Sequence, residues 1–225
     1  MRYRARNKQF GTNYYHFVYK NVLFLCMTSE TGAIEKKDDI GHDGGIDTEQ
    51  YEYFKKVLED HPDVCWTFAF MHRPLWDGSK NIGRWDDLEA LLHQRKHTVI
   101  VGHTHSYVAY KRQGADYLNL STTGGISPLR GLFLGEFDHV TLVTVPSEGE
   151  PVYANLALSG ILDDQIINES IHTVAEEFTH HPPVKIVPFF IDGDTFSGCT
   201  TKIALQNVHT QPLSLSRASS WTATC

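Results

Sequence analysis

The stretch TVIVGHTH, residues 98–105, is a short apolar run that ends abruptly in two histidines. Its first four residues are apolar or β-branched, which is typical of a strand that is covered on both faces of a sheet. Gly102 permits a sharp turn at the point where the run ends. The stretch therefore predicts a buried strand that carries polar side chains at its carboxyl end.

Two similar apolar runs precede it, VLFLCM at residues 22–27 and VCWTFAFM at residues 64–71. Asp47 followed by Gln50 resembles a capping box, and helical spacing of apolar residues predicts a helix over 48–60. A second predicted helix carries Trp85, Leu88, Leu91 and Leu92. The order strand, helix, strand, helix, strand predicts an α/β fold with right-handed crossovers and a largely parallel sheet.

After residue 107 the sequence predicts strands without helices, at residues 107–111, 117–120, 140–145 and 152–158, which we expect to complete the sheet system as antiparallel strands. Residues 161–181 are mixed and polar and are interpreted as a linker. Strand-like segments follow at 184–191 and 201–205. We therefore expect a domain at residues 1–160, and a linker with an incomplete β-rich domain at 161–225.

Composition excludes several classes of protein. The net charge of −7 over 225 residues gives no general attraction to nucleic acid or anionic membranes. No apolar run approaches the roughly 20 residues that a membrane-spanning helix needs. The four cysteines are scattered, with no CxxC pair, which argues against a zinc ribbon. Nothing in the sequence indicates a compartment.

The candidate site consists of residues that follow predicted strands. His72 comes after the second apolar run, and His103 and His105 come after the third. Ligands bind outside the carboxyl ends of parallel strands, so these imidazoles are expected at one place. In an extended segment His103 and His105 would project to one side about 6 to 7 Å apart, able to share a metal ion or to serve two adjacent ions. Arg73 is placed to neutralise an anion, whereas Tyr107 either lines the pocket or packs in the core.

Two motifs resemble those of a known family. FMHRPLW at residues 70–76 resembles the single-histidine motif of the calcineurin-like metallophosphoesterases, which include the purple acid phosphatases, and VGHTHSY at 101–107 resembles their paired-histidine motif. Weaker matches in the same order occur at residues 14–17, 50–54, 118–125 and 137–140. The resemblance covers roughly residues 10–158 and corresponds to the C-terminal half of the family pattern.

The resemblance implies the second half of an α/β/β/α sandwich, followed by the start of a β-rich C-terminal unit. It also implies hydrolysis of a small-molecule or nucleotide phosphate ester at two metal ions, with Mn, Fe or Zn as the suitable metals. By resemblance, His72 and His103 would bind one metal ion and His105 the other, and Arg73 and Tyr107 would bind substrate.

The family's upstream motifs, which supply the bridging carboxylate and an assisting histidine, do not occur before His72. The catalytic residues are therefore unknown, and we expect an internal portion of a longer phosphoesterase. Without a bridging carboxylate, two cations cannot be held about 4 Å apart, so we expect weak or no activity from this chain alone.

The sequence leaves three alternatives open. The chain could be a non-catalytic metal-binding or regulatory remnant of the same fold that holds one metal ion on three histidines. It could be a subunit whose site is completed by another polypeptide, or an interaction protein without metal. A truncated sheet would also expose an unpaired edge, through which the chain could self-associate.

Overall fold

The structure is a computed structural model that describes residues 13–30, 44–76, 83–186 and 202–208. The chain divides into two compact units, residues 1–172 and 173–225. No helix among the described residues is long and apolar enough to cross a bilayer.

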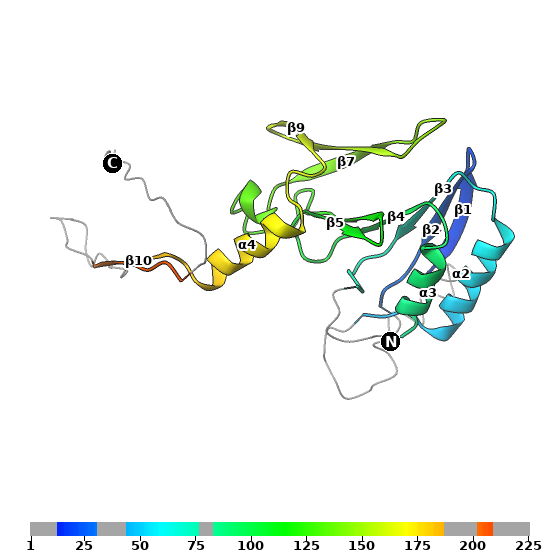
Figure 1. Cartoon of the computed structure of the whole chain (residues 1–225), viewed down its shortest axis with the longest axis horizontal. Coiled ribbons are helices and arrows are strands. Elements are labelled where there is room, and N and C mark those ends of the chain that lie inside the picture. Colours follow the sequence, from blue (N-terminus) through cyan, green and yellow to red (C-terminus); the bar gives the residue numbers. More distant parts are fainter. Residues whose placement is uncertain (1–12, 31–43, 77–82, 187–201, 209–225) are drawn as a thin grey trace. The chain divides into compact units, whose positions relative to one another are not determined.

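The first unit is built on a six-stranded sheet with the order β1-β2-β3-β4-β6-β5 (Figure 1). Strands β2, β3, β4 and β6 are parallel, while β1 and β5 at the two edges run antiparallel to their neighbours. The strands are β1 Tyr15–Tyr19, β2 Val22–Cys26, β3 Trp66–Phe70, β4 His97–Val101, β5 Val108–Arg112 and β6 Ala115–Asn119.

These elements confirm a mixed α/β fold with a largely parallel central sheet. The expectation that all later strands are antiparallel is wrong for β6, which pairs in parallel with β4 and antiparallel with β5. A tight turn after β5 returns the chain beside β4, so β6 lies between the two. The local sequence of residues 107–120 does not determine which of the two hairpin strands pairs with β4.

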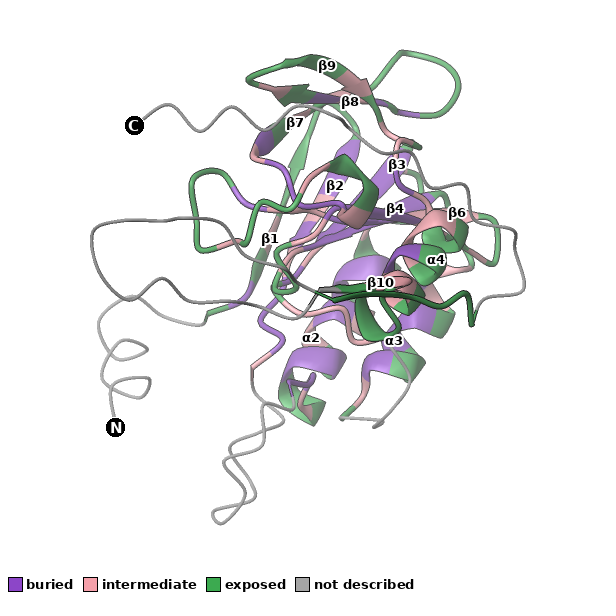
Figure 2. Cartoon of the chain, turned by 90° about the vertical axis from the view of Figure 1, so that its left-hand side faces the viewer, coloured by how far each residue is buried: buried purple, intermediate pink, exposed green. Residues whose placement is uncertain are grey.

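Two helices cover one face of this sheet, α2 Thr48–Asp60 and α3 Trp85–Leu92. The helix expected over 48–60 is confirmed, because Phe54, Val57 and Leu58 recur at helical spacing and are buried against the sheet. Figure 2 shows the buried residues on the sides of these helices that face the strands.

A second sheet packs on the opposite face of the first and consists of β7 His139–Thr144, β8 Val152–Ala157 and β9 Gly160–Asp163, in the order β7-β8-β9. All its pairs are antiparallel. The hydroxyls of Tyr153 on β8 and Thr98 on β4 lie 2.6 Å apart and join the two sheets. A 3-10 turn, η2 Leu132–Leu134, precedes this sheet.

Residues 161–181, which the sequence predicts to be a linker, include most of β9 and the helix α4 Glu169–His180. Asn168 starts this helix, its side-chain oxygen accepting a hydrogen bond from the Ile171 amide at 3.1 Å. Ile171 packs against the apolar core between the sheets. One apolar face and a good cap therefore suffice for a helix in a polar segment.

In the second unit, β10 Val184–Ile186 pairs antiparallel with β11 Ile203–Leu205. These two short strands fall within the segments expected at 184–191 and 201–205. The remainder of those segments, apart from residue 202, lies outside the described residues.

The stability of the first unit should depend on pH through His97, a residue of β4 that is 3% exposed. Burial lowers the pKa of His97, and its hydrogen bond to the Arg95 carbonyl, at 2.9 Å, only partly opposes this. Nearby charges also act on it: those of His93 and Arg95 lower this pKa, and that of Glu89 raises it. The unfolded chain binds the proton more readily, so stability is full above about pH 6.5 and falls as the pH drops below it.

We predict that His97→Asn, whose amide can still donate to Arg95, reduces the loss of stability between about pH 7.5 and about pH 5.5. The measurement is the urea midpoint at the two pH values, with His180→Asn on the exposed end of α4 as control. An unchanged pH dependence in His97→Asn would show that other groups govern acid unfolding.

Candidate metal centre

The parallel register of the central sheet brings the candidate residues to one edge. Phe70 of β3 lies opposite Ile100 of β4, so His72 and His103, which follow these strands, emerge beside one another. The amide of Gly102 donates to the carbonyl of His72 at 3.0 Å and extends this pairing beyond the strands. The predicted site at the carboxyl edge therefore has a physical basis in the strand pairing.

The imidazoles of His72 and His103 are in direct contact. His103 Nδ1 lies 3.1 Å from His72 Nε2, and the ring centroids are 5.0 Å apart with the planes nearly perpendicular. Two imidazole nitrogens on one tetrahedral ion, each about 2.0–2.1 Å from it, are about 3.3 Å apart. The observed spacing is thus close to that required for a shared metal ion.

Arg73 fixes the proton positions in this pair. Its Nη1 lies 3.0 Å from His103 Nε2, and a guanidinium can only donate, so His103 Nε2 accepts. His103 then carries its proton on Nδ1 and donates it to His72 Nε2. A metal ion on Nδ1 would require the opposite tautomer of His103, with the proton on Nε2. Arg73 and the ion therefore favour opposite tautomers of this ring.

The loop after β2 holds Arg73 in place. The backbone amide of Arg73 donates to Ser29 Oγ at 2.9 Å, and Arg73 Nε donates to Glu30 Oε1 at 2.8 Å. Partial desolvation lowers the pKa of His103, and the positive charges of Arg73 and His72 lower it further. The ring is therefore neutral near pH 7, the form in which imidazole binds a metal ion.

The expectation of an extended segment at His103 and His105 is wrong. Both residues have positive φ values, 77° for His103 and 59° for His105, in the left-handed region that non-glycine residues rarely adopt. Asn119 Nδ2 donates to Thr104 Oγ1 at 2.5 Å, and Ser121 Oγ donates to the His105 carbonyl at 2.9 Å. These contacts hold a strained turn, a feature that is common at binding sites.

The structure does not bring the other two predicted residues into contact with the pair. No described contact joins the exposed His105 imidazole to His72 or His103, although its charge slightly lowers the pKa of His103. Tyr107 is fully buried between the sheets, and its hydroxyl donates to the Asp164 carbonyl at 2.7 Å. Tyr107 thus adopts the packing role that the sequence left open.

Sequence reasoning missed the contribution of Gln50. As expected, Asp47 caps α2 by accepting a hydrogen bond from the Gln50 amide at 2.8 Å, but the Gln50 side chain also acts beyond this cap. It is fully buried and pairs with both backbone groups of Thr28 at 2.9 Å. Thr28 precedes Ser29 and Glu30, so this amide fixes the loop that holds Arg73. The signal that could have revealed this role is an amide side chain on the buried side of a helix, where it needs a hydrogen-bond partner.

The ligand set is incomplete among the described residues. Across residues 13–30, 44–76, 83–186 and 202–208, no group of three or more His, Cys, Asp or Glu side chains is arranged to hold a metal ion. Glu30, whose carboxylate pairs with Arg73, does not join the two histidines as a third ligand. His72 and His103 are therefore spaced as two ligands of one metal ion would be, and no third ligand accompanies them among the described residues.

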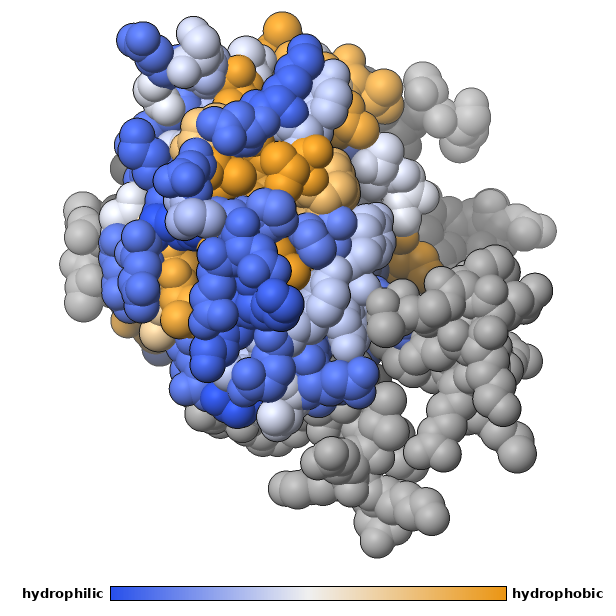
Figure 3. Space-filling view, turned by 90° about the vertical axis from the view of Figure 1, so that its right-hand side faces the viewer, coloured by the Kyte–Doolittle hydropathy of each residue, from blue (hydrophilic) through white to orange (hydrophobic). Residues whose placement is uncertain are grey.

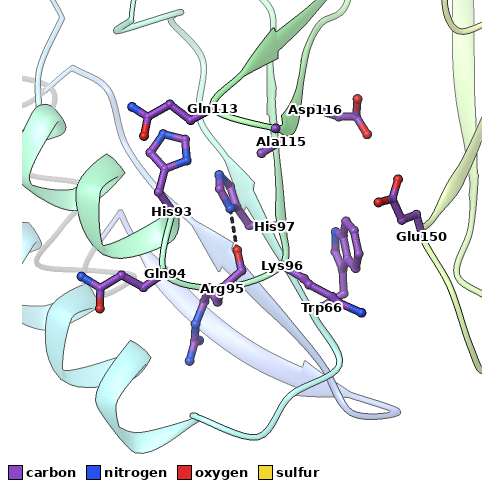
Figure 4. Close-up of a pocket in the computed structure, with 11 residues that line it drawn as sticks. Trp66, His93, Gln94, Arg95, Lys96, His97, Gln113, Ala115, Asp116 and Glu150 are labelled. Atoms are coloured by element: carbon purple, nitrogen blue, oxygen red, sulfur yellow. Dashed lines mark hydrogen bonds between the residues drawn. The ribbon is translucent and has the colours of Figure 1, made fainter.

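A separate cavity of about 290 Å³ lies at the opposite, amino-terminal edge of the strands, where Trp66 and His97 begin β3 and β4. Figure 4 shows His93 and His97 on one side of it and the carboxylates of Asp116 and Glu150 on the other. This cavity is distinct from the histidine pair at the carboxyl edge.

Comparison with known proteins adds no assignment. No model of a known protein family matches the chain. No curated protein matches it at a significant level of similarity.

We predict that Gln50→Leu destabilises the chain by about 2–4 kcal/mol, because it removes the two hydrogen bonds that the Gln50 side chain makes with the buried backbone of Thr28. Glu59→Leu, an exposed change on the same helix, should cost less than about 0.5 kcal/mol. Urea unfolding at neutral pH measures both. Similar costs for the two variants would show that Gln50 does not secure the β2 loop.

Proposed function

We propose that the edge formed by His72, His103 and Arg73 is part of the active site of a metal-dependent phosphoesterase. The observation that carries this proposal is the 3.1 Å approach of two imidazole nitrogens beside a guanidinium. Such a combination suits a cation bound to nitrogen and an anion bound to the arginine. The resemblance of residues 70–76 and 101–107 to metallophosphoesterase motifs points to the same chemistry.

In this proposal His72 Nε2 and His103 Nδ1 hold one metal ion, and His105 serves a second. When bound, the ions would polarise a phosphoryl oxygen and supply hydroxide at neutral pH. Arg73 gives up its bond to His103 and donates instead to the phosphate oxygens, for which its planar guanidinium is well suited. Glu30 keeps that guanidinium aligned through its bond to Nε.

The layers of the first unit support the assignment of its fold to the α/β/β/α sandwich of the metallophosphoesterases. Helices α2 and α3, the six-stranded sheet and the β7-β8-β9 sheet form three successive layers. We propose that these are three of the four layers of an α/β/β/α metallophosphoesterase sandwich. The carboxylates that bridge the two metal ions would then come from polypeptide outside the described residues.

The direct test is the binding of inorganic phosphate to the chain with and without Mn²⁺ or Zn²⁺. We predict metal-dependent phosphate binding that is lost in His103→Ala, together with little or no turnover of p-nitrophenyl phosphate. His180→Ala, on the exposed end of α4, is the control for non-specific metal binding. Phosphate binding that does not depend on metal, or on His103, would contradict the proposal. Turnover abolished by His103→Ala would support the function, but it would contradict the prediction of weak or no activity because it would show that the site is complete.

The competition at His103 gives a second prediction. Arg73→Ala should strengthen Zn²⁺ binding about tenfold, because it frees His103 Nε2 to carry the proton. The same change should weaken metal-dependent phosphate binding at least tenfold, because the guanidinium is lost. Arg84→Ala, which removes a half-buried arginine that pairs with Asp87 and lies over the Tyr51 ring, should alter neither. Calorimetric titration measures both affinities, and parallel losses in Arg73→Ala would contradict this arrangement.

One observation favours a second candidate, a non-catalytic metal-binding or regulatory remnant. Among the described residues only two of the three predicted histidines are in contact. A remnant would bind a single metal ion and melt at a lower temperature when chelator is added, without any effect of metal on phosphate binding.

A further inference from the structure

The segment of residues 121–138, which leads from β6 to β7, is buried mainly near its two ends. Residues 123–126 and 128–130 are exposed, and the 3-10 turn η2 contains no buried residue. The buried residues of the segment are Thr122 near its start and residues 135–137 near its end. A segment with few buried contacts opens more readily than the strands that flank it.

His139, the first residue of β7, holds the two ends of this segment together. Its backbone amide donates to the Thr122 carbonyl at 3.0 Å, and its carbonyl accepts a hydrogen bond from Thr123 Oγ1 at 2.7 Å. Its ring is 4% exposed, and the ring centroids of Tyr107 and Phe137 lie 5.3 and 4.8 Å from its own. The start of the segment, its end and the residue before β5 therefore all contact one histidine.

The buried ring of His139 has no acceptor for a second proton. Nδ1 lies 3.3 Å from the Phe137 carbonyl, and a carbonyl can only accept, so Nδ1 carries the proton of the neutral ring. Nε2 is buried, and none of the described residues gives it a hydrogen-bond partner. A proton on Nε2 would create a charge that is shielded from water and has no acceptor. The closed segment therefore requires a neutral ring.

Protonation of this ring favours an open segment. Burial lowers the pKa of His139, and the Phe137 carbonyl and the charge of Asp138 only partly oppose this. In an open segment the ring meets water, and its pKa returns toward about 6.5. The open state thus binds the proton more readily, so opening is rarest above about pH 6.5 and becomes more frequent as the pH falls below it.

The other titratable groups at this place keep their charge in the same pH range. Hydrogen bonds from Thr122 and Arg130 lower the pKa values of Asp138 and Glu136, so both carboxylates stay ionised between about pH 5.5 and about pH 7.5. Burial raises the pKa of the phenol that faces the His139 ring, so this phenol stays neutral. The acid response of the segment therefore depends on His139.

The same segment supports the turn that carries His105. Ser121 Oγ donates to the His105 carbonyl at 2.9 Å, and the Tyr107 amide donates to the Gly135 carbonyl at 2.7 Å. Gly135 has a φ of 69°, and a Cβ at this position would clash with the Tyr107 carbonyl oxygen, so only glycine permits this approach. Opening of the segment removes the support on both sides of the turn.

We propose that His139 is a proton-sensitive contact that controls this segment. When its ring binds a proton, residues 121–138 detach from Tyr107 and from the start of β7, and the turn that carries His105 is released. Acid therefore loosens one side of the carboxyl edge while the six-stranded sheet stays folded. This inference concerns a local opening and does not depend on the proposed phosphoesterase activity.

The test is amide hydrogen exchange at about pH 7.5 and about pH 5.5, corrected for the pH dependence of the intrinsic exchange rate. The amides of Gly124 and of residue 139 report opening, because they bond to Asp138 Oδ1 and to the Thr122 carbonyl. The variant is His139→Asn, whose amide can still donate to the Phe137 carbonyl but does not titrate. Thermal unfolding confirms that the variant is folded.

Two further variants control for other histidines. His97→Asn removes the buried histidine of β4. His105→Asn removes the exposed histidine that the segment contacts and replaces it with a residue that tolerates the positive φ of this position. The amides of α2 are the reference for unfolding of the whole unit. This helix lies on the side of the molecule shown in Figure 3, where the lower half of the surface is largely hydrophilic.

We expect acidification to raise the equilibrium constant for opening at Gly124 and residue 139 by about fivefold to tenfold. The increase should persist in His97→Asn and His105→Asn and fall below about twofold in His139→Asn. The proposal is overturned by no increase in the unmodified chain, by an equal increase in His139→Asn, or by an equal increase at the amides of α2.

A second measurement decides the matter if His139→Asn does not fold. Nitrogen NMR of the unmodified chain reports the protonation of the His139 ring. We expect a ring that carries its proton on Nδ1 and stays neutral wherever the Gly124 amide is protected. A His139 ring that is charged at about pH 5.5 while this amide remains protected would overturn the proposal.

Discussion

Parallel pairing of β2, β3 and β4 is the constraint on which the site depends. Each of these strands runs in the same direction and ends at the same level, so the residues that follow them meet at one edge. Ser29, His72 and His103 are far apart in the sequence and come together for this reason alone. The backbone hydrogen bond from Gly102 to His72 continues the pairing into the loops and sets the distance between the two imidazoles.

Much of this fold could be predicted because its elements carry strong local patterns. The helix over 48–60 has a capping aspartate and a regular apolar face, and the three buried strands are short apolar runs. The errors have a different cause. Which strand of the β5–β6 hairpin pairs with β4 depends on contacts between the hairpin and β4. Helix α4 forms because Ile171 packs against apolar residues of the core. Neither contact is visible in the local sequence.

The candidate site shows the same division. The positions of His72 and His103 at strand ends could be predicted, since they depend only on the order of the strands. The backbone of the turn could not, because His103 and His105 adopt left-handed conformations that side chains from β6 and the following loop hold in place. The bond between Arg73 and His103 and the pairing of Gln50 with Thr28 depend on tertiary contacts between distant segments.

We propose that His103 Nδ1 and His72 Nε2 form a metal-binding pair controlled by Arg73. The most direct test is nitrogen NMR of the histidine rings during a titration with Zn²⁺. We predict that the free protein carries the His103 proton on Nδ1, and that Zn²⁺ shifts the nitrogen signals of His103 Nδ1 and His72 Nε2 while the proton moves to His103 Nε2. A His103 ring that keeps its proton on Nδ1 at saturating Zn²⁺ would contradict it.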